Sequence, residues 1–559
     1  MVLLRATAVC LAAHTLLVAA SPAQVPLVET VMTADPTVQL DEGTFTGKYR
    51  GQSAHYLGIP FAHPPTGDRR FRLPEPVPPY EGNQMAQKYG FSCPQQPLTM
   101  PGWIDGAVTK VINAALNNMV DGIVPASEDC LTINVSVPKD AKPGDNLPVV
   151  VWIFGGGFEI GGTSTFDGGA VVDRSIKLGM PIIYVSMNYR VTAFGFLPGK
   201  EVKKDGVGNL GLQDQRLALR WVNKYIKNFG GDPSKVTIWG ESAGAISVSL
   251  HLLTNGGDNE GLFRGAIMQS GGPIPVGDIE HGQKYYDAIV DATGCHRSSD
   301  TLNCLRNVPY TTLKRAVDQS PNFFAYQGLV LAWLPRVDGV FLTGPPQHLV
   351  LQNKVANVPM ITGNCDDEGS LFSISSGNIT STSQLHTYFK TFMLPNAKDA
   401  HIDLMLQYYP DDPREGCPFD TGLRNAIGPQ FKRVAAVQGD VVFHGPRRFF
   451  IKQRGDKQPT WSFINKRMKD TPFIGAAHAT DLLQSFGDFE LKDYIIRFVV
   501  NQDPNGKQGL GIPWPRYDNQ KRQAMLFQDS AIFPLRVVKD DYRDAPLDFI
   551  ANLSLINPI

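Results

Sequence analysis

The segment Gly240-Glu241-Ser242-Ala243-Gly244 constrains the fold of this chain more than any other. A β-rich run at 235–239 precedes it, and an apolar run at 245–250 that can begin a helix follows it. The glycines let the backbone turn tightly without a side-chain clash. A serine on such a strand-to-helix turn has an exposed hydroxyl near the positive end of the helix, as a nucleophile requires. G-x-S-x-G also arises by chance in a chain with 54 glycines. The rest of the sequence must therefore show whether Ser242 is a nucleophile.

Strand-like runs alternate with helical runs along the chain. Between residues 214 and 229, apolar side chains recur at every fourth position, which predicts a helix with one buried face. Short apolar runs predict buried strands at 147–154, 181–187, 236–239, 264–268, 359–362 and 460–464. The alternation predicts an α/β fold with a mainly parallel sheet. Sites in such sheets lie beyond the carboxyl ends of the strands, where Ser242 is placed.

Composition and the N-terminal residues limit the class of protein that this chain can be. The chain has 559 residues, 42% hydrophobic and 19% charged, and its net charge of −1 predicts no attraction to nucleic acid. Residues 1–20 have the pattern of a signal peptide, with Arg5, an apolar run and small residues before Ser21. This run is shorter than the roughly 20 residues that a membrane-spanning helix needs, and no later run is long and apolar enough. The sequence therefore predicts a secreted, extracellular protein without a transmembrane segment.

Cysteine usage fits an oxidising compartment. Cys10 leaves with the predicted signal peptide. Cys93 and Cys130 could close one loop, and Cys295 and Cys304 another. In the chain-entropy description, the larger closure would stabilise the fold by about 4 kcal/mol and the smaller by about 3 kcal/mol.

The remaining cysteines and three sequons complete the list of possible covalent features. Cys365 and Cys417 could pair with each other or stay free. No C-x-x-C motif or ligand cluster is present, so no metal is expected. Sequons for N-glycosylation stand at Asn134, Asn378 and Asn552, of which Asn134 lies in an alternating, strand-like run.

A serine nucleophile needs a base and a carboxylate that orients the base. In α/β-hydrolases the carboxylate follows the serine in the chain, and the histidine comes last. After the predicted strand at 359–362 stand three carboxylates, Asp366, Asp367 and Glu368. Spacing alone allows any of them to be the acid, and it also allows a solvated acidic turn.

Four histidines follow that acidic segment. His478 is flanked by small residues, which suit a crowded loop where an imidazole meets two partners. His386 and His401 lie in polar, helix-like stretches and are predicted to be surface residues, which leaves His444 as the fourth. Asp481, close to His478 in sequence, is an alternative partner for the base.

A glycine-rich segment directly follows the predicted strand at 147–154. Phe154-Gly155-Gly156-Gly157-Phe158 can turn backbone N–H groups toward a negative oxygen, as an oxyanion hole requires. A plain flexible turn is the alternative. The glycines do not continue as G-x-G-x-x-G, so no nucleotide cofactor is predicted.

Several segments together point to one family. Besides the Ser242 turn, the matching stretches are 57–62 (LGIPFA), 127–131 (SEDCL), 152–158 (WIFGGGF), 188–190 (NYR), 208–212 (GNLGL), 229–233 (FGGDP) and 367–369 (DEG). The chain resembles the type-B carboxylesterase/lipase family from about residue 40 to near its end. It looks most similar to the Candida rugosa-like fungal lipases and sterol esterases, because of 299–302 leading to Cys304 and of 478–481.

The resemblance implies an α/β-hydrolase fold: a large, mainly parallel central sheet flanked by helices, in a single catalytic domain over 21–559. It implies these roles: Ser242 as nucleophile, Glu368 as acid, His478 as base, and the amides of Gly156, Gly157 and Ala243 as oxyanion donors. It also implies the disulfides Cys93–Cys130 and Cys295–Cys304. No metal or cofactor is needed for the implied chemistry.

The loop between Cys93 and Cys130 bears on the substrate. Its apolar residues between Ile104 and Ile123 form a stripe at helical spacing, which an ordinary core-facing helix would also show. In the resembling lipases this loop is a lid, whose apolar face can turn toward lipid. We therefore expect a lipase or sterol esterase that acts on long acyl chains at a lipid–water interface. An apolar lid could also favour a homodimer.

Two other functions fit the same family. One is a short-chain carboxylesterase. The other is a non-catalytic, cholinesterase-like binding protein, because some members keep the fold without a working triad. The presence of Ser242, Glu368 and His478 in the required order favours an enzyme.

Overall fold

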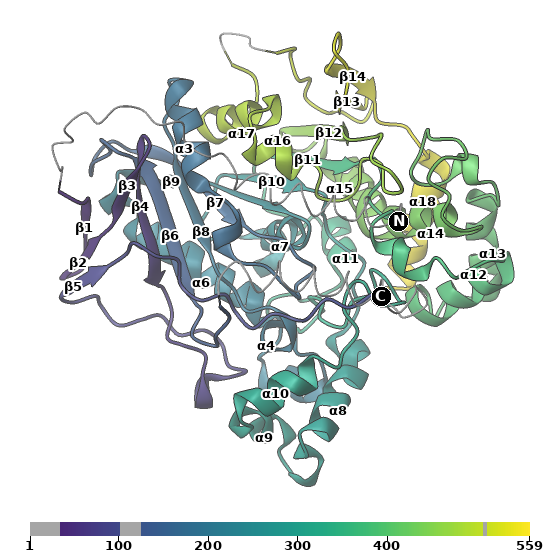
Figure 1. Ribbon diagram of the computed structural model, residues 1–559, viewed down its shortest axis with the longest axis horizontal. Helices are drawn as coiled ribbons and strands as arrows, with labels where there is room; N and C mark the ends of the chain where they lie inside the picture. The colour runs from purple at the N-terminus through teal and green to yellow at the C-terminus, as the bar shows by residue number, and fades with distance from the viewer. Residues whose placement is uncertain (1–33, 101–124, 507–510) are drawn as a thin grey trace.

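The computed structural model describes residues 34–100, 125–506 and 511–559. Within these residues, eleven strands form one twisted sheet in the order β14-β13-β12-β11-β10-β9-β7-β8-β6-β4-β3 (Figure 1). The strands are β3 (Lys48–Arg50), β4 (Ser53–Pro60), β6 (Thr132–Pro138), β7 (Leu147–Ile153), β8 (Ile183–Met187), β9 (Gly231–Glu241), β10 (Gly265–Gln269), β11 (Met360–Cys365), β12 (Thr460–Lys466), β13 (Gln523–Gln528) and β14 (Leu535–Lys539).

The middle of this sheet is parallel and its edges are antiparallel. Strands β8, β7, β9, β10, β11, β12 and β13 are parallel neighbours in that order. β6 pairs antiparallel with β8, and β14 with β13. A small separate sheet holds β1 (Thr37–Leu40), β2 (Gly43–Thr46) and β5 (Asn83–Met85). The prediction of a mainly parallel sheet is confirmed, and β7 to β12 lie at the six predicted strand positions.

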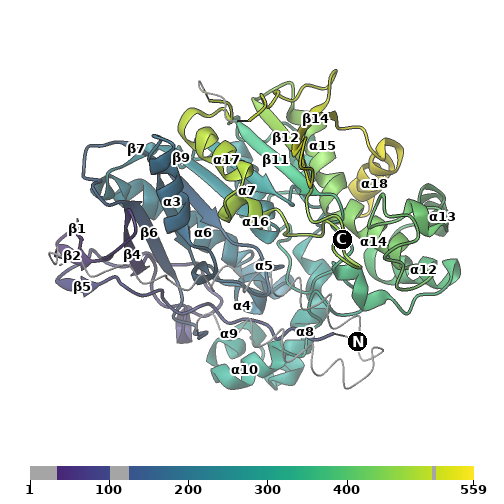
Figure 2. The same ribbon diagram turned by 45° about the horizontal axis from the view of Figure 1, so that its top comes forward.

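Helices cover both faces of the sheet. α3 (Gly168–Lys177) and α17 (Glu490–Asn501) pack on one face, and α6 (Leu210–Tyr225) and α7 (Ala243–His251) pack on the other (Figure 2). Because both faces are covered, every residue of β8 is buried, as its mostly apolar sequence predicts. The helix predicted at 214–229 is α6, which passes into a 3₁₀ turn at Ile226–Phe229.

Further helices lie around this core and at its ends. They are α4 (Thr192–Phe196), α5 (Lys200–Asp205), α8 (Gln283–Ala292), α9 (Thr301–Asn307), α10 (Tyr310–Val317), α11 (Pro346–Leu351), α12 (Thr382–Tyr388), α13 (Asp399–Tyr408), α14 (Phe431–Gly439), α15 (Gly445–Arg454), α16 (Leu482–Phe486) and α18 (Asp544–Ile556). A π-helical turn at Asp440–His444 joins α14 to α15. Such turns are often found at functional sites, because they redirect side chains within a helix.

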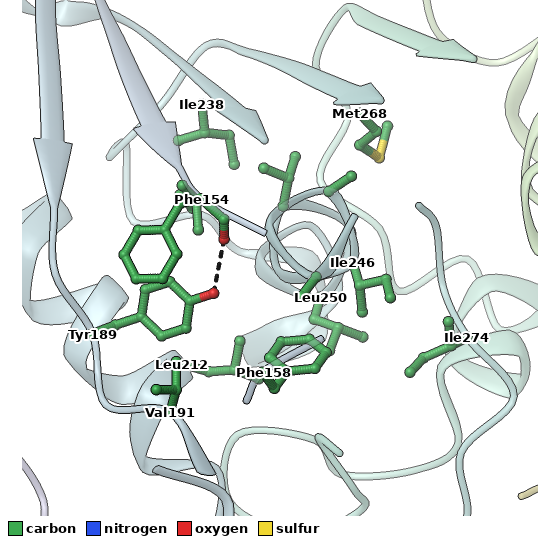
Figure 3. Packing of buried hydrophobic residues seen from close by; sticks show 14 of the residues in the cluster. Phe154, Phe158, Tyr189, Val191, Leu212, Ile238, Ile246, Leu250, Met268 and Ile274 are labelled. Carbon is green, nitrogen blue, oxygen red and sulfur yellow. Dashed lines mark hydrogen bonds between the residues drawn. The ribbon is translucent and has the colours of Figure 1, made fainter. Parts of the chain in front are cut away.

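The core reaches the glycine-rich segment through Phe154, the residue after β7. The ring of Tyr189 stacks on that of Phe154 with centroids 4.3 Å apart. The Tyr189 hydroxyl donates a hydrogen bond of 2.8 Å to the Phe154 carbonyl oxygen (Figure 3). Packing and hydrogen bonding therefore fix the backbone just before the glycines.

Both expected disulfides are present. Cys93 bonds Cys130 with a Cα–Cα distance of 5.0 Å, and Cys295 bonds Cys304 with a Cα–Cα distance of 5.7 Å. Cys365 and Cys417 are free and buried, which settles the question that the sequence left open.

The three sequons differ in their surroundings. Asn134 lies in β6 with only 3% of its surface exposed, and its side-chain nitrogen donates to Thr163 Oγ1 at 3.0 Å. Because a glycan would have to replace this buried contact, the structure disfavours glycosylation at Asn134, which stays a prediction. Asn378 and Asn552 are exposed, and glycosylation there stays a prediction.

Two sequence predictions fall on residues that the structure leaves undescribed. The signal peptide at 1–20 and the apolar stripe at 104–123 of the lid loop lie outside the described residues. Across the part of the chain that is described, no helix has the length and apolar character to cross a membrane.

Candidate active site

Ser242 lies on the tight turn between β9 and α7, as its motif predicts. Its φ of 56° and ψ of −126° place a non-glycine residue in a strained conformation, which is typical of functional sites. A Cβ added to Gly244 would come within 2.0 Å of the Ile153 carbonyl oxygen, so the turn requires glycine there. The Ser242 amide donates to the Gln269 carbonyl at 2.9 Å, and this bond ties the turn to β10.

His478 joins Ser242 to Glu368 in one hydrogen-bonded chain. His478 Nε2 lies 2.8 Å from Ser242 Oγ, and His478 Nδ1 lies 2.6 Å from Glu368 Oε2. The other oxygen of Glu368 accepts from the Cys365 amide at 2.8 Å and from Asn364 Nδ2 at 3.2 Å. When Nδ1–H donates to Glu368, Nε2 is left as an acceptor for the serine proton.

The neighbouring carboxylates have other partners. Asp366 and Asp367 both accept hydrogen bonds from Lys469. Asp481, the alternative partner, accepts from Gln269 Nε2 at 2.9 Å. Of the three carboxylates that spacing left open, Glu368 is therefore the one that the fold brings to His478.

The other late histidines lie elsewhere. His386 and His401 are partly exposed, in agreement with the expectation of surface positions. His444 is buried and its Nδ1 bonds the Tyr542 hydroxyl at 2.9 Å.

The glycine-rich segment lies against the serine turn. A Cβ added to Gly155 would come within 2.8 Å of Ser242 Cβ. Gly156 and Gly157 have φ angles of 110° and 63°, which suit glycine. Gly156, Gly157 and Ala243 line the same pocket as Ser242.

Charge around His478 favours its protonated form. Burial by itself lowers the pKa of His478, but the attraction of Glu368 and Glu241 outweighs it and raises the pKa to about 9. Burial raises the pKa of Glu241 to about 8, and the Oε1 atom of Glu241 lies 3.4 Å from His478 Nε2. Sequence reasoning missed Glu241 as a neighbour of the base, although it stands beside the serine in the motif itself.

The pocket in front of Ser242 is apolar. Its volume is about 290 Å³. Phe323, Phe324, Leu371 and Phe372 all line it. The rings of Phe372 and Phe443 also pack on His478, with centroids 5.2 Å and 4.5 Å from the imidazole. Phe443 lies in the π-helical turn at 440–444, and no pattern in the sequence placed it here.

Comparison with known proteins identifies the family of this chain. The sequence profile of the Carboxylesterase family matches residues 34–550. The chain belongs to this family.

The chain is similar to known lipases and to a solved structure over nearly its whole length. It is 44% identical to Lipase 4 of Diutina rugosa, over 92% of this chain and 95% of that protein. It is 41% identical to Secreted lipase 1 of Botryotinia fuckeliana, over 95% of each chain. The crystal structure of Aspergillus niger EstA matches with a TM-score of 0.79 and 27% identity, over 94% of this chain and 99% of that one.

These matches confirm the resemblance on which the sequence predictions were based, and they confirm the α/β-hydrolase fold. This carboxylesterase is a carboxylic ester hydrolase.

Proposed function

We propose that the protein hydrolyses carboxylic esters of long-chain fatty acids, with Ser242, His478 and Glu368 as its catalytic triad. The observation that carries the proposal is the hydrogen-bonded chain from Glu368 through His478 to Ser242 at the wall of an apolar pocket. A mostly apolar pocket with a few polar groups beside the nucleophile suits a fatty acyl chain whose ester carbonyl must be held at one point.

The reaction proceeds in two acyl transfers. His478 Nε2 takes the proton from Ser242 Oγ while this oxygen attacks the ester carbonyl carbon. The resulting oxyanion accepts hydrogen bonds from the amides of Gly156, Gly157 and Ala243. The intermediate then collapses, the carbon–oxygen bond to the alcohol breaks, and the alcohol leaves with the proton held by His478.

Water completes the cycle. His478 takes a proton from water as the water oxygen attacks the acyl carbon. The second intermediate then collapses, the bond from the acyl carbon to Ser242 Oγ breaks, His478 returns its proton to Ser242 Oγ, and the fatty acid is released. Glu368 keeps Nδ1 protonated and stabilises the imidazolium in both halves. The attraction of Glu368 that stabilises the imidazolium also raises the pKa of His478, and the serine proton is taken by the fraction of the enzyme in which His478 is neutral.

Relatives support the substrate class and the location. Among the matches are proteins named Secreted lipase 1 and Secreted triacylglycerol lipase LIP1. Together with the predicted signal peptide at 1–20, these names support secretion and action on lipid esters. The lid at 93–130, action at a lipid–water interface, steryl ester hydrolysis and a homodimer stay predictions.

Replacement of the nucleophile tests the mechanism. We expect Ser242→Ala to lower kcat by about 10⁶-fold without changing the fold, because no other group can form the acyl-enzyme. The measurement is ester hydrolysis by the purified variant, with circular dichroism as the control for folding. Near-normal turnover, or failure of a fluorophosphonate probe to label Ser242 in the parent protein, would favour a non-catalytic binding protein.

A substrate panel tests the acyl-chain preference. We expect hydrolysis rates to rise with acyl length and to rise further on emulsified glyceryl or steryl esters. The rates are compared with and without detergent, against short-chain soluble esters of the same alcohol. A preference for the short soluble esters would identify a short-chain carboxylesterase instead.

A further inference from the structure

The two loops that carry Glu368 and His478 are far apart in sequence and must be held in register. Glu368 follows β11, and His478 lies in the segment after β12, 110 residues later. The productive distance between Glu368 Oε2 and His478 Nδ1 is 2.6 Å, and shifts of the order of 1 Å at such a contact cost catalysis strongly. Something must therefore fix one loop to the other.

Asp367, the neighbour of Glu368, makes two bonds to Ala476, two residues before His478. The Asp367 amide donates to the Ala476 carbonyl at 3.0 Å. In return, the Ala476 amide donates to Asp367 Oδ2 at 2.8 Å. We call this reciprocal pair of bonds the Asp367 clip. It joins the two loops immediately beside the two residues that must meet.

The carboxylate of Asp367 also anchors a third segment and is itself held. Its Oδ1 accepts from the Phe419 amide at 2.8 Å. Lys469 Nζ lies 2.8 Å from each oxygen, so one ammonium group donates to both oxygens of the carboxylate. Gly475 has a φ of 61°, and a Cβ there would come within 2.3 Å of Asp367 Oδ2, so the chain leaves room for this contact.

The charge of Asp367 depends on Lys469. Asp367 is fully buried, and burial together with the neighbouring Asp366 raises its pKa to about 6, whereas Lys469 acts in the opposite direction. The ammonium group therefore helps to keep Asp367 ionised, with both oxygens available as acceptors, at neutral pH.

We propose that Asp367, held by Lys469, is a positioning residue that keeps His478 in register with Glu368 through the Asp367 clip. The inference rests on the proposed function of His478 and Glu368. Asp367 does not reach the reacting atoms, so its effect passes through the base that it positions.

Asp367→Asn is the decisive variant. Both oxygens of Asp367 face backbone N–H groups, those of Ala476 and Phe419. Whichever way the amide of an asparagine is turned, its NH₂ group faces one of these donors, so one bond is lost. Asp366→Asn is the matched control, because the Asp366 carboxylate also accepts from Lys469 but makes no bond to the backbone around Ala476 in the described structure.

We expect Asp367→Asn to lower kcat by about 10- to 100-fold on a soluble ester, with KM changed less than twofold. Asp366→Asn should stay within about twofold of the parent in both. Activity is expressed per active site titrated with a fluorophosphonate, so that misfolded protein does not count. An unchanged kcat per titrated site in Asp367→Asn, with only a lower Tm, would mean a purely structural role and overturn the proposal.

Lys469 provides a second test if Asp367→Asn does not fold. We expect Lys469→Met to lower kcat at pH 6 to 7 at least fivefold and Lys469→Arg to restore most of it, because an arginine can still bond the carboxylate. Equal kcat for the parent and Lys469→Met would overturn the role of Lys469. These outcomes are distinct from failure of the proposed function, which near-normal turnover by Ser242→Ala would show.

Discussion

The serine side and the histidine–glutamate side of the site are built in different ways. On the serine side, the turns at 154–158 and 240–244 follow the neighbouring strands β7 and β9, whose register pairs Ile153 with Gly240. Backbone hydrogen bonds and glycine contacts fix these turns. On the other side, two loops 110 residues apart meet through the side chains of Glu368 and Asp367, which bond His478 and the Ala476 amide, and through one backbone bond from Asp367 to Ala476.

The difference predicts what each side tolerates. The serine side should be sensitive to a Cβ added at Gly156, Gly240 or Gly244, because the nearest atoms there are backbone atoms that cannot move independently. The histidine–glutamate side should be sensitive to the loss of particular polar groups, because these groups set the distance between loops. Mutations on the two sides test this difference.

After loss of the nucleophile itself, the largest effect is expected on the histidine–glutamate side. Glu368→Gln should lower kcat by about 10⁴-fold, because a neutral amide no longer fixes the tautomer of His478 or stabilises its charged form. Asp481→Asn, a change of the same kind at the alternative carboxylate, should cost less than tenfold. Steady-state kinetics on a soluble ester measure both. Equal losses in the two variants would mean that Asp481 shares the role of the acid.

The next effect concerns the serine side. Gly156→Ala should lower kcat by about 10²- to 10³-fold, the cost of losing one oxyanion donor, because the new Cβ would come within 2.3 Å of the Ile160 carbonyl oxygen. Gly206→Ala is the control, since Gly206 also has a positive φ, of 69°, but open space around its Cβ position. The control should lose about 1 kcal/mol of stability and keep its kcat. A similar loss of kcat in both variants would show that backbone strain alone is responsible.

The smallest effect is a pH dependence of stability at Asp481. Burial raises the pKa of this carboxyl to about 6 from 3.8. Between these two pH values the folded protein binds more protons at Asp481 than the unfolded chain does, so this group weakens folding as pH rises. Asp481→Asn removes the titration, and its stability relative to the parent should increase from pH 4 to pH 7 by at most about 3 kcal/mol.

Urea unfolding of the parent and Asp481→Asn at several pH values measures this increase. A difference that stays constant across the range would show that Asp481 ionises as easily in the folded chain as in the unfolded one. In that case, polar contacts on this side of the site are better solvated than the buried geometry indicates.

The sequence was most informative where function depends on local backbone geometry. The Ser242 turn and the glycines after β7 are contiguous motifs, because a strand end and the turn after it are set by nearby residues and by the need for glycine. The strands β7 to β12 were equally predictable, because burial on both faces favours short, mostly apolar runs. Asn134 shows the limit of such motifs, since a sequon carries no information about burial.

The α/β architecture, the serine turn and a short set of possible acids and bases follow from local sequence patterns. The contact of Glu368, rather than Asp366, Asp367 or Asp481, with His478 is seen only in the folded chain, as are the positions of Glu241 and Phe443 beside His478. The physical reason is that side chains from loops after different strands converge in a way that depends on the register of the whole sheet. Local motifs predict which turns form, whereas contacts between distant loops depend on how the whole chain packs.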